Sequence, residues 1–226
     1  MRLLIVIPAF NESEMIRSVI ARIPQKIAKI GSITTLIVDD GSIDNTAKIA
    51  RQQKIKVIRH LINRGLGATL ATGFRFARSN NFDIMVTLDA DGQHDPQDIK
   101  RLIKPLVKNQ ADVVIGSRLL QANGMPWKRK LVNFLSNILT WGLFSVWVSD
   151  SQSGFRLFNK RAIERIRLRS QHMEVSSEIL KEIHRNHLRL QEVSIKSVYT
   201  LYSLRKGQKL TNAPNVIWQL LLNRFS

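Results

Sequence analysis

The 226-residue sequence contains no cysteine, which excludes disulfide frameworks and metal sites built from thiolates. It has neither a Gly-rich Walker loop nor a Gly-x-Gly-x-x-Gly fingerprint, so a kinase-like or dinucleotide-binding site has little support. The apolar run at 3–7 is too short for a signal peptide and is not followed by a small-residue cleavage site. What is present, 44% hydrophobic and 23% charged residues, is typical of one globular domain.

The net charge of +18 is distributed unevenly along the chain. Residues 1–118 carry 18 Lys and Arg against 11 Asp and Glu, whereas residues 119–226 carry 17 against 6. Such a field attracts nucleic acid, anionic lipid headgroups or phosphorylated substrates, and composition alone does not choose among them. Against nucleic acid, aromatic residues are sparse at 7%, no familiar recognition motif appears, and acidic clusters would repel a phosphate backbone.

Strand-like and helix-like segments alternate in the first part of the chain. The apolar runs at 3–7, 34–38, 57–59, 84–88 and 113–115 predict strands, and the intervening patterns at 13–23, 44–53, 67–79 and 96–109 predict helices. This order indicates an α/β fold with a mostly parallel central sheet flanked by helices. Each acidic cluster follows a predicted strand, at the sheet edge where such folds bind ligands.

Two acidic clusters have a chemical interpretation. Asp89 and Asp91 can both approach one Mg²⁺ or Mn²⁺ ion, and Gln93 can add an amide oxygen, although a solvated turn is the ordinary alternative. Asp39 and Asp40 can accept hydrogen bonds from a base or a ribose, the alternative being a turn that caps the next helix. The segment from Pro8 to Glu12 would form the other wall, with Phe10 against the base and Glu12 on a loop or a ribose.

The pattern changes after residue 118. A basic cluster at 127–130 precedes 18 uncharged residues, 131–148, in which polar side chains recur at helical spacing. The stretch is marginal in length for a membrane span, so an interfacial helix over 127–148 suits it better. A buried amphipathic helix of the core stays open as the alternative.

Six motifs in register resemble those of family 2 glycosyltransferases, most closely the dolichyl- and polyprenyl-phosphate mannosyl- and glucosyltransferase branch. They are Pro-Ala-Phe-Asn-Glu at 8–12, Val-Asp-Asp-Gly-Ser at 38–42, Asn-Arg-Gly at 63–65, Asp-Ala-Asp-Gly-Gln at 89–93, Gly-Ser-Arg at 116–118 and Ser-Gly-Phe-Arg at 153–156. The resemblance implies a GT-A fold and an inverting, metal-dependent transfer from a UDP- or GDP-sugar. It implies a GT-A catalytic domain over 1–210, with a nucleotide-binding part at 1–118, an acceptor-binding part at 119–210 and a helical tail at 211–226.

The resemblance also assigns roles to individual residues. A first group would bind the nucleotide, namely Pro8, Phe10, Glu12, Asp39, Asp40 and Ala90, and a second would hold the metal, namely Asp89, Asp91 and Gln93. Arg118 would face a phosphate, and Asp150, Ser153 and Arg156 would shape the acceptor side; Asp91, Arg118 and Asp150 are the candidate catalytic residues. Arg205 and Lys209 would belong to a segment that closes over phosphates.

The expected acceptor is a polyprenyl phosphate, because an ionised phosphate can attack the anomeric carbon without a general base. A saccharide hydroxyl is the alternative, and Asp150 or Glu178 would then be the candidate base. We expect a cytoplasmic protein that associates peripherally with the cytoplasmic face of the membrane. It would bind the anionic membrane surface directly or through a membrane-protein partner, and it would not bind nucleic acid.

Overall fold

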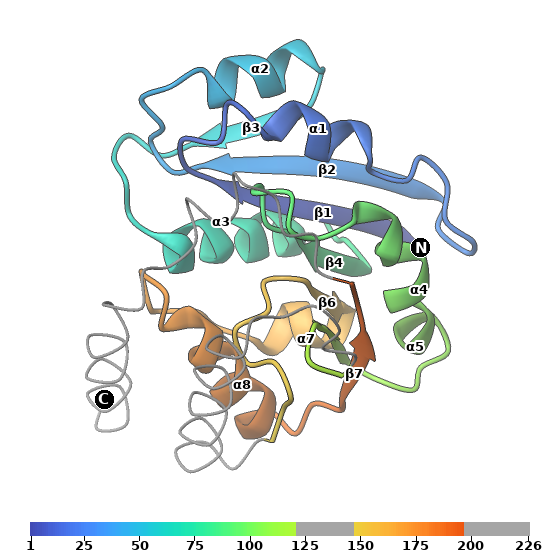
Figure 1. The fold of residues 1–226 in the computed structure, drawn as a ribbon. Helices are drawn as coiled ribbons and strands as arrows, with labels where there is room; N and C mark the ends of the chain where they lie inside the picture. Colours follow the sequence, from blue (N-terminus) through green and yellow to red (C-terminus); the bar gives the residue numbers. More distant parts are fainter. Residues whose placement is uncertain (121–146, 197–226) are drawn as a thin grey trace.

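A seven-stranded sheet forms the centre of the computed structural model, which describes residues 1–120 and 147–196 (Figure 1). The strands are β1 (Arg2–Ala9), β2 (Ser32–Asp39), β3 (Lys56–Arg59), β4 (Ile84–Thr87), β5 (Val113–Ser117), β6 (Arg156–Asn159) and β7 (Leu190–Ser194). Their order is β3-β2-β1-β4-β6-β5-β7, and β6 alone runs antiparallel to its neighbours β4 and β5. The predicted α/β fold with a mostly parallel sheet is confirmed.

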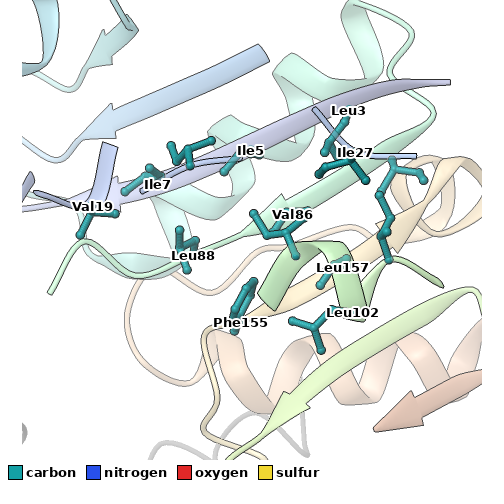
Figure 2. Packing of buried hydrophobic residues seen from close by; sticks show 14 of the residues in the cluster. Leu3, Ile5, Ile7, Val19, Ile27, Val86, Leu88, Leu102, Phe155 and Leu157 are labelled. Carbon is teal, nitrogen blue, oxygen red and sulfur yellow. The ribbon is translucent and has the colours of Figure 1, made fainter. Parts of the chain in front are cut away.

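Helices cover both faces of the sheet, because the buried strands are apolar on both sides. Along β1, Leu3, Ile5 and Ile7 face one cluster of buried side chains, whereas Leu4 and Val6 face the other. The first cluster, part of which Figure 2 shows, includes residues of α1 (Ile16–Ala21), α2 (Thr46–Gln52), α4 (Ile99–Leu102) and α5 (Lys104–Val107). The second includes residues of α3 (Leu66–Ser79), α7 (Lys160–Arg165) and α8 (Val175–Arg185).

The prediction of a single helix over 96–109 is wrong. The chain forms a 3₁₀ turn, η1 (Pro96–Asp98), and then the short helices α4 and α5. Pro105 has no N–H group to donate to the carbonyl of Arg101, so the regular hydrogen-bond ladder is interrupted at this point. The first helix is also shorter than the predicted 13–23, because residues 13–15 form a turn and the helix ends at Ala21.

Strands from both halves of the sequence lie side by side. Strand β6 inserts between β4 and β5, and β7 pairs with the outer side of β5 in parallel register. The first residue of β6, Arg156, is therefore opposite Thr87 at the carboxyl end of β4. This arrangement brings residues 149–156 to the edge of the sheet where the acidic clusters lie.

Several predictions fall on residues outside the described ranges. These are Arg205, Lys209, the tail 211–226 and the helix 127–148 except for its last two residues. Of those two, Trp147 is exposed and Val148 is buried. Among the residues that the structure does describe, no helix is both long enough and apolar enough to cross a bilayer.

Candidate active site

The carboxyl ends of β1, β2 and β4 lie next to one another, since these strands pair in parallel. The register places Ala9 opposite Asp39, and Val6 opposite Thr87. The segments that follow these strands, 10–12, 40–42 and 89–93, therefore gather at one edge, as the sequence predicts. The loop after β3, the end of β5 and the turn before β6 lie at the same edge.

Asp40 is held by its own chain. Its carboxylate faces the loop after β3, where it accepts hydrogen bonds from the N–H groups of Arg64 at 3.0 Å and Gly65 at 2.6 Å. The imidazole Nδ1 of His60 lies 2.7 Å from the same carboxylate, which is only 5% exposed. Asp40 thus fixes the 60–65 loop, and its contact with a nucleotide stays a prediction.

Asp39 is also buried. Its Oδ1 accepts a hydrogen bond from the Ser42 N–H at 3.3 Å, and its Oδ2 lies 3.1 Å from Arg59 Nε. Arg59 donates in turn to the Ser42 carbonyl at 2.6 Å. These contacts give the turn after β2 a fixed shape, which is what a binding wall requires.

Glycines in the Asn-Arg-Gly-Leu-Gly segment allow a close approach between the two halves of the chain. A β-carbon at Gly67 would lie 2.1 Å from the Ser170 carbonyl oxygen, and one at Gly65 would lie 2.5 Å from that of Gln171. Gly65 also has φ +90°, a conformation that disfavours other residues. The loop that binds Asp40 therefore rests on residues 170–171 and cannot accept side chains there.

The turn after β1 is tied to the turn after β2. The Asn11 N–H donates to Ser42 Oγ at 2.9 Å, and the Glu12 N–H donates to Thr46 Oγ1 at 2.8 Å. Glu12 is buried, whereas Phe10 is 40% exposed at the rim of the site. The position of Phe10 is compatible with the predicted packing against a base.

Asp89 lies among cationic and histidine side chains. His94 Nε2 is 3.4 Å from Asp89 Oδ2, and Arg156 is buried beside them. Burial disfavours the charged carboxylate, but the interaction with His94 and the charges of Arg118 and Arg156 outweigh it and lower the pKa of Asp89. Asp89 is therefore ionised at neutral pH.

Asp91 behaves in the opposite way. Burial and the negative charge of Asp89, with a smaller effect from Glu12, raise the pKa of Asp91 to about 6. The Gln93 N–H donates to Asp91 Oδ1 at 2.9 Å and fixes the turn. The two carboxylates are thus close enough to repel each other.

This pair fits a divalent cation. Two carboxylates that repel each other in the free protein would be stabilised by a hard cation between them. Within residues 1–120 and 147–196, no three His, Cys, Asp or Glu side chains are grouped to hold a metal. Mg²⁺ and Mn²⁺ commonly use one or two carboxylates and complete their coordination with substrate phosphates and water. The amide of Gln93 as a further ligand stays a prediction.

Arg118 and Asp150 form a bidentate ion pair. Arg118 Nε donates to Asp150 Oδ2 at 2.7 Å and its Nη2 donates to Oδ1 at 2.8 Å, while the Arg118 backbone N–H lies 3.1 Å from Oδ2. The side chain of Asp150 is fully buried and that of Arg118 is 15% exposed. Burial opposes ionisation, but the contacts with Arg118 outweigh it and lower the pKa of Asp150.

Arg156 and Ser153 shape this side of the site from within the protein. The guanidinium of Arg156 donates to the carbonyls of Ser151 at 2.7 Å and Ser153 at 2.8 Å, and more weakly to that of Ser176 at 3.3 Å. Burial lowers the pKa of Arg156 to about 10, so the group stays charged at neutral pH. Ser153 Oγ donates to the Gly116 carbonyl at 2.6 Å. Both side chains are buried, so they hold the 151–156 turn rather than project from it.

Sequence reasoning assigned no role to several residues of this network. His94 follows the Asp-Ala-Asp-Gly-Gln motif directly, and that adjacency was an available signal. His60, Ser149 and Glu192 lie in segments without a recognisable pattern, so only the fold reveals their contacts.

Two further predicted residues lie at the same edge of the sheet. Ala90 is buried beneath the site, and Pro8 lines a small cavity with Thr87, Asp89 and Arg156.

The chain is similar to known proteins over most of its length. The model of the family described as "Glycosyl transferase family 2" matches residues 4–167. UDP-N-acetylglucosamine–dolichyl-phosphate N-acetylglucosaminyltransferase of Methanococcus voltae is 34% identical over 96% of this chain and 94% of its own. Polyprenol monophosphomannose synthase of Mycolicibacterium smegmatis is 30% identical over 74% of this chain and 65% of its own.

Among solved structures, glucosyl-3-phosphoglycerate synthase of Mycobacterium tuberculosis has a similar fold. Its complex with Mn²⁺, uridine diphosphate and phosphoglyceric acid matches with a TM-score of 0.75 at 20% identity. The match covers 98% of this chain and 78% of that one. At this level of identity the likeness concerns the fold, and it extends over the whole sheet.

Proposed function

Because the chain belongs to glycosyl transferase family 2, we propose that it transfers a sugar from a UDP- or GDP-sugar, with inversion, to a polyprenyl phosphate. The Methanococcus relative, aligned over nearly its full length, carries a UDP-sugar and a dolichyl phosphate in its name. The mycobacterial relative is named for a polyprenol monophosphomannose product. UDP-N-acetylglucosamine is therefore the first donor to test.

The donor would bind across the carboxyl ends of β1, β2 and β4. The turn at 10–12 and the turn at 39–42 would hold the nucleoside between them, with Phe10 at the rim. Asp89, Asp91 and Gln93 would hold a Mg²⁺ or Mn²⁺ ion at the diphosphate, and that cation would neutralise the charge of the leaving group. Arg156 stays charged beside Asp89 and balances part of the negative charge of the site.

The observation that carries the choice of acceptor is the ion pair of Asp150. Arg118 donates to both oxygens of the Asp150 carboxylate, and these contacts lower the pKa of Asp150. Asp150 is therefore a poor proton acceptor. The other candidate base, Glu178, accepts hydrogen bonds from the N–H groups of Arg169 at 2.8 Å and Ser170 at 3.0 Å. A phosphate acceptor needs no base, whereas a sugar hydroxyl does.

Arg118 would then contact the acceptor phosphate, with Asp150 fixing its guanidinium. A phosphate carried by a polyprenyl lipid comes from a membrane, and the charge of +18 favours an anionic membrane surface. We therefore place the protein at the cytoplasmic face of the membrane, bound peripherally or through a membrane-protein partner.

Product extraction tests this proposal. Purified protein is supplied with Mn²⁺, a labelled UDP- or GDP-sugar, a polyprenyl phosphate and an oligosaccharide acceptor, and the reaction is extracted with organic solvent. We expect label in the organic phase, released by mild acid, and none with the Asp91→Ala variant. Label that appears only in water-soluble glycan would instead indicate a saccharide hydroxyl acceptor and overturn the proposal.

A further inference from the structure

A carboxylate on the edge strand β7 anchors the turn that carries Asp150. Both Glu192 oxygens accept from the Ser149 N–H, at 2.9 and 3.0 Å, and Oε1 also lies 3.3 Å from the Asp150 N–H. Ser149 Oγ lies 2.7 Å from Glu192 Oε1. Glu192 is more than forty residues away in sequence, so only the fold makes this contact.

The direction of the hydroxyl hydrogen bonds follows from the carboxylate. An ionised Glu192 can only accept, so Ser149 Oγ donates to it. Ser149 Oγ is also 2.6 Å from Ser117 Oγ, and because its one proton is used, Ser117 must donate to Ser149. The lone pairs of Ser117 Oγ in turn accept from the N–H groups of Leu119 at 3.2 Å and Leu120 at 3.3 Å.

This chain of hydrogen bonds links the residues that precede both members of the Arg118–Asp150 pair. Ser117 immediately precedes Arg118 and Ser149 immediately precedes Asp150. The register of β7 with β5, in which Glu192 is opposite Ile115 and Ser194 opposite Ser117, holds the carboxylate at this level. The carboxylate of Glu192 therefore helps to fix the backbone next to both Arg118 and Asp150.

We propose that Glu192 is a positioning residue, which acts through Ser149 and Ser117 to fix the Arg118–Asp150 pair where the acceptor phosphate binds. The proposal rests on the acceptor role of Arg118 given above. Without the carboxylate, the N–H and O–H groups of Ser149 lose the hydrogen bonds to Glu192, and the turn at 149–150 can shift. The proposed donor site at the carboxyl ends of β1, β2 and β4 includes no residue of this chain of bonds.

The test compares KM for the acceptor with Kd for the sugar nucleotide in full-length variants. Glu192→Ala should raise the acceptor KM about tenfold and leave the nucleotide Kd within about twofold. Glu192→Gln, which keeps one accepting oxygen, should restore part of the loss and also serves if the alanine variant fails to fold. The matched control is Gln191→Ala, because Gln191 is the exposed neighbour on the same strand.

Arg118→Ala separates this inference from the proposed function. If it raises the acceptor KM while Glu192→Ala and Glu192→Gln do not, the positioning role of Glu192 is overturned and the acceptor role of Arg118 stands. If Arg118→Ala itself leaves the acceptor KM unchanged, the acceptor role fails, and the assignment of Glu192 fails with it. A rise in nucleotide Kd equal to the rise in KM would also overturn the assignment, because it would indicate a general structural role.

Discussion

The carboxylate of Asp89 rests directly against the α-carbon of Gly154. A β-carbon at position 154 would lie 2.3 Å from both carboxylate oxygens, well inside van der Waals contact. The Thr87 hydroxyl donates to the Gly154 carbonyl at 2.7 Å and keeps this backbone in place. Gly154, the glycine of the Ser-Gly-Phe-Arg motif, therefore leaves the space that the carboxylate of Asp89, a predicted metal ligand, occupies. It does so although it lies 65 residues further along the chain.

The first prediction concerns this contact. Gly154→Ala should displace the Asp89 carboxylate and weaken Mn²⁺-dependent binding of the sugar nucleotide by about tenfold or more, because one ligand leaves its position. Binding is measured by calorimetry with and without Mn²⁺. The control is Gly31→Ala, since a β-carbon there would meet nothing nearer than the Met1 carbonyl oxygen at 3.8 Å. Equal metal-dependent affinity in the two variants would show that Asp89 does not hold the cation.

The second prediction concerns pH. Burial and the charge of Asp89 raise the pKa of Asp91 to about 6, and a metal ligand must be ionised. The affinity for Mn²⁺ with the nucleotide should therefore be constant above pH 7 and fall towards tenfold per unit below pH 6. Calorimetric titrations between pH 5 and pH 8 (about the range that brackets this pKa) measure the effect.

The stability of the metal-free protein should depend on pH in the opposite direction: it should fall as pH rises, whereas the affinity for Mn²⁺ should increase. A raised pKa means that the fold favours protonated Asp91, so its contribution is present below pH 3.8, the ordinary value, and is lost as pH rises through about 6. Asp91→Asn has no proton to lose, so its melting temperature should rise relative to wild type as pH increases from 5 to 7. A constant difference between the two proteins would contradict the raised pKa.

The strands and the acidic edge could be predicted from the sequence because their signals are local. Short apolar runs identified β1, β2, β4 and β5, and Asp-rich turns follow β2 and β4. Parallel pairing of β1 with β2 and β4 then required the carboxyl ends of these three strands to meet. The interrupted helix at 96–109 was missed because the Pro at its start was given weight, whereas the break that follows from Pro105 was not.

The residues that organise the site were not accessible in this way. The sequence predicts that Asp40 contacts the nucleotide, but it does not show that the Asp40 carboxylate also holds the loop at 60–65. The position of that loop depends on close packing of Gly65 and Gly67 against 170–171. Strand β6 and its antiparallel insertion have no local signal, and the contacts of Gly154 follow from that insertion. The contacts of Glu192 also require the pairing of β7 with β5. Long-range pairing, rather than residue type, decides these roles.

The third prediction tests whether Arg118 and Asp150 act as one unit. Arg118→Ala and Asp150→Ala should each lower kcat/KM for the acceptor, and the double variant should be little worse than either, because both singles break the same bidentate pair. Steady-state kinetics with varied acceptor measure the three values. If Asp150 were instead a general base, Asp150→Asn would lower kcat far more than Arg118→Ala and would remove the acidic limb of the pH profile.

The fourth prediction concerns stability at the opposite edge of the sheet. Asp112 precedes β5 and accepts hydrogen bonds from the Arg189 backbone N–H at 2.9 Å, from Arg189 Nε at 3.1 Å and from Asn159 Nδ2 at 2.9 Å. Burial opposes ionisation, but these contacts outweigh it and lower the pKa of Asp112 to about 2. Only 1% of Asp112 is exposed, whereas the Arg189 side chain is 48% exposed and stays solvated when its partner is removed. Asp112→Ala should therefore reduce the free energy of unfolding by about 1–2 kcal/mol at pH 7, because the Arg189 N–H and the Asn159 amide lose this acceptor.

The pH dependence identifies the cause of that loss. Because the pKa of Asp112 is lowered in the folded protein, its contribution is complete above the ordinary value of 3.8 and disappears as pH falls towards 2. The difference between wild type and Asp112→Ala, measured by urea unfolding, should therefore shrink between pH 5 and pH 2.5 (about the range set by the two pKa values). Arg101→Ala is the control, because its exposed pair with Asp98 should contribute at most about 0.5 kcal/mol. Nucleotide binding should be unchanged in both variants, since Asp112 lies at the amino end of β5. If Asp112→Ala lost as much unfolding free energy at pH 2.5 as at pH 5, the cause would be a packing defect instead of a broken ion pair.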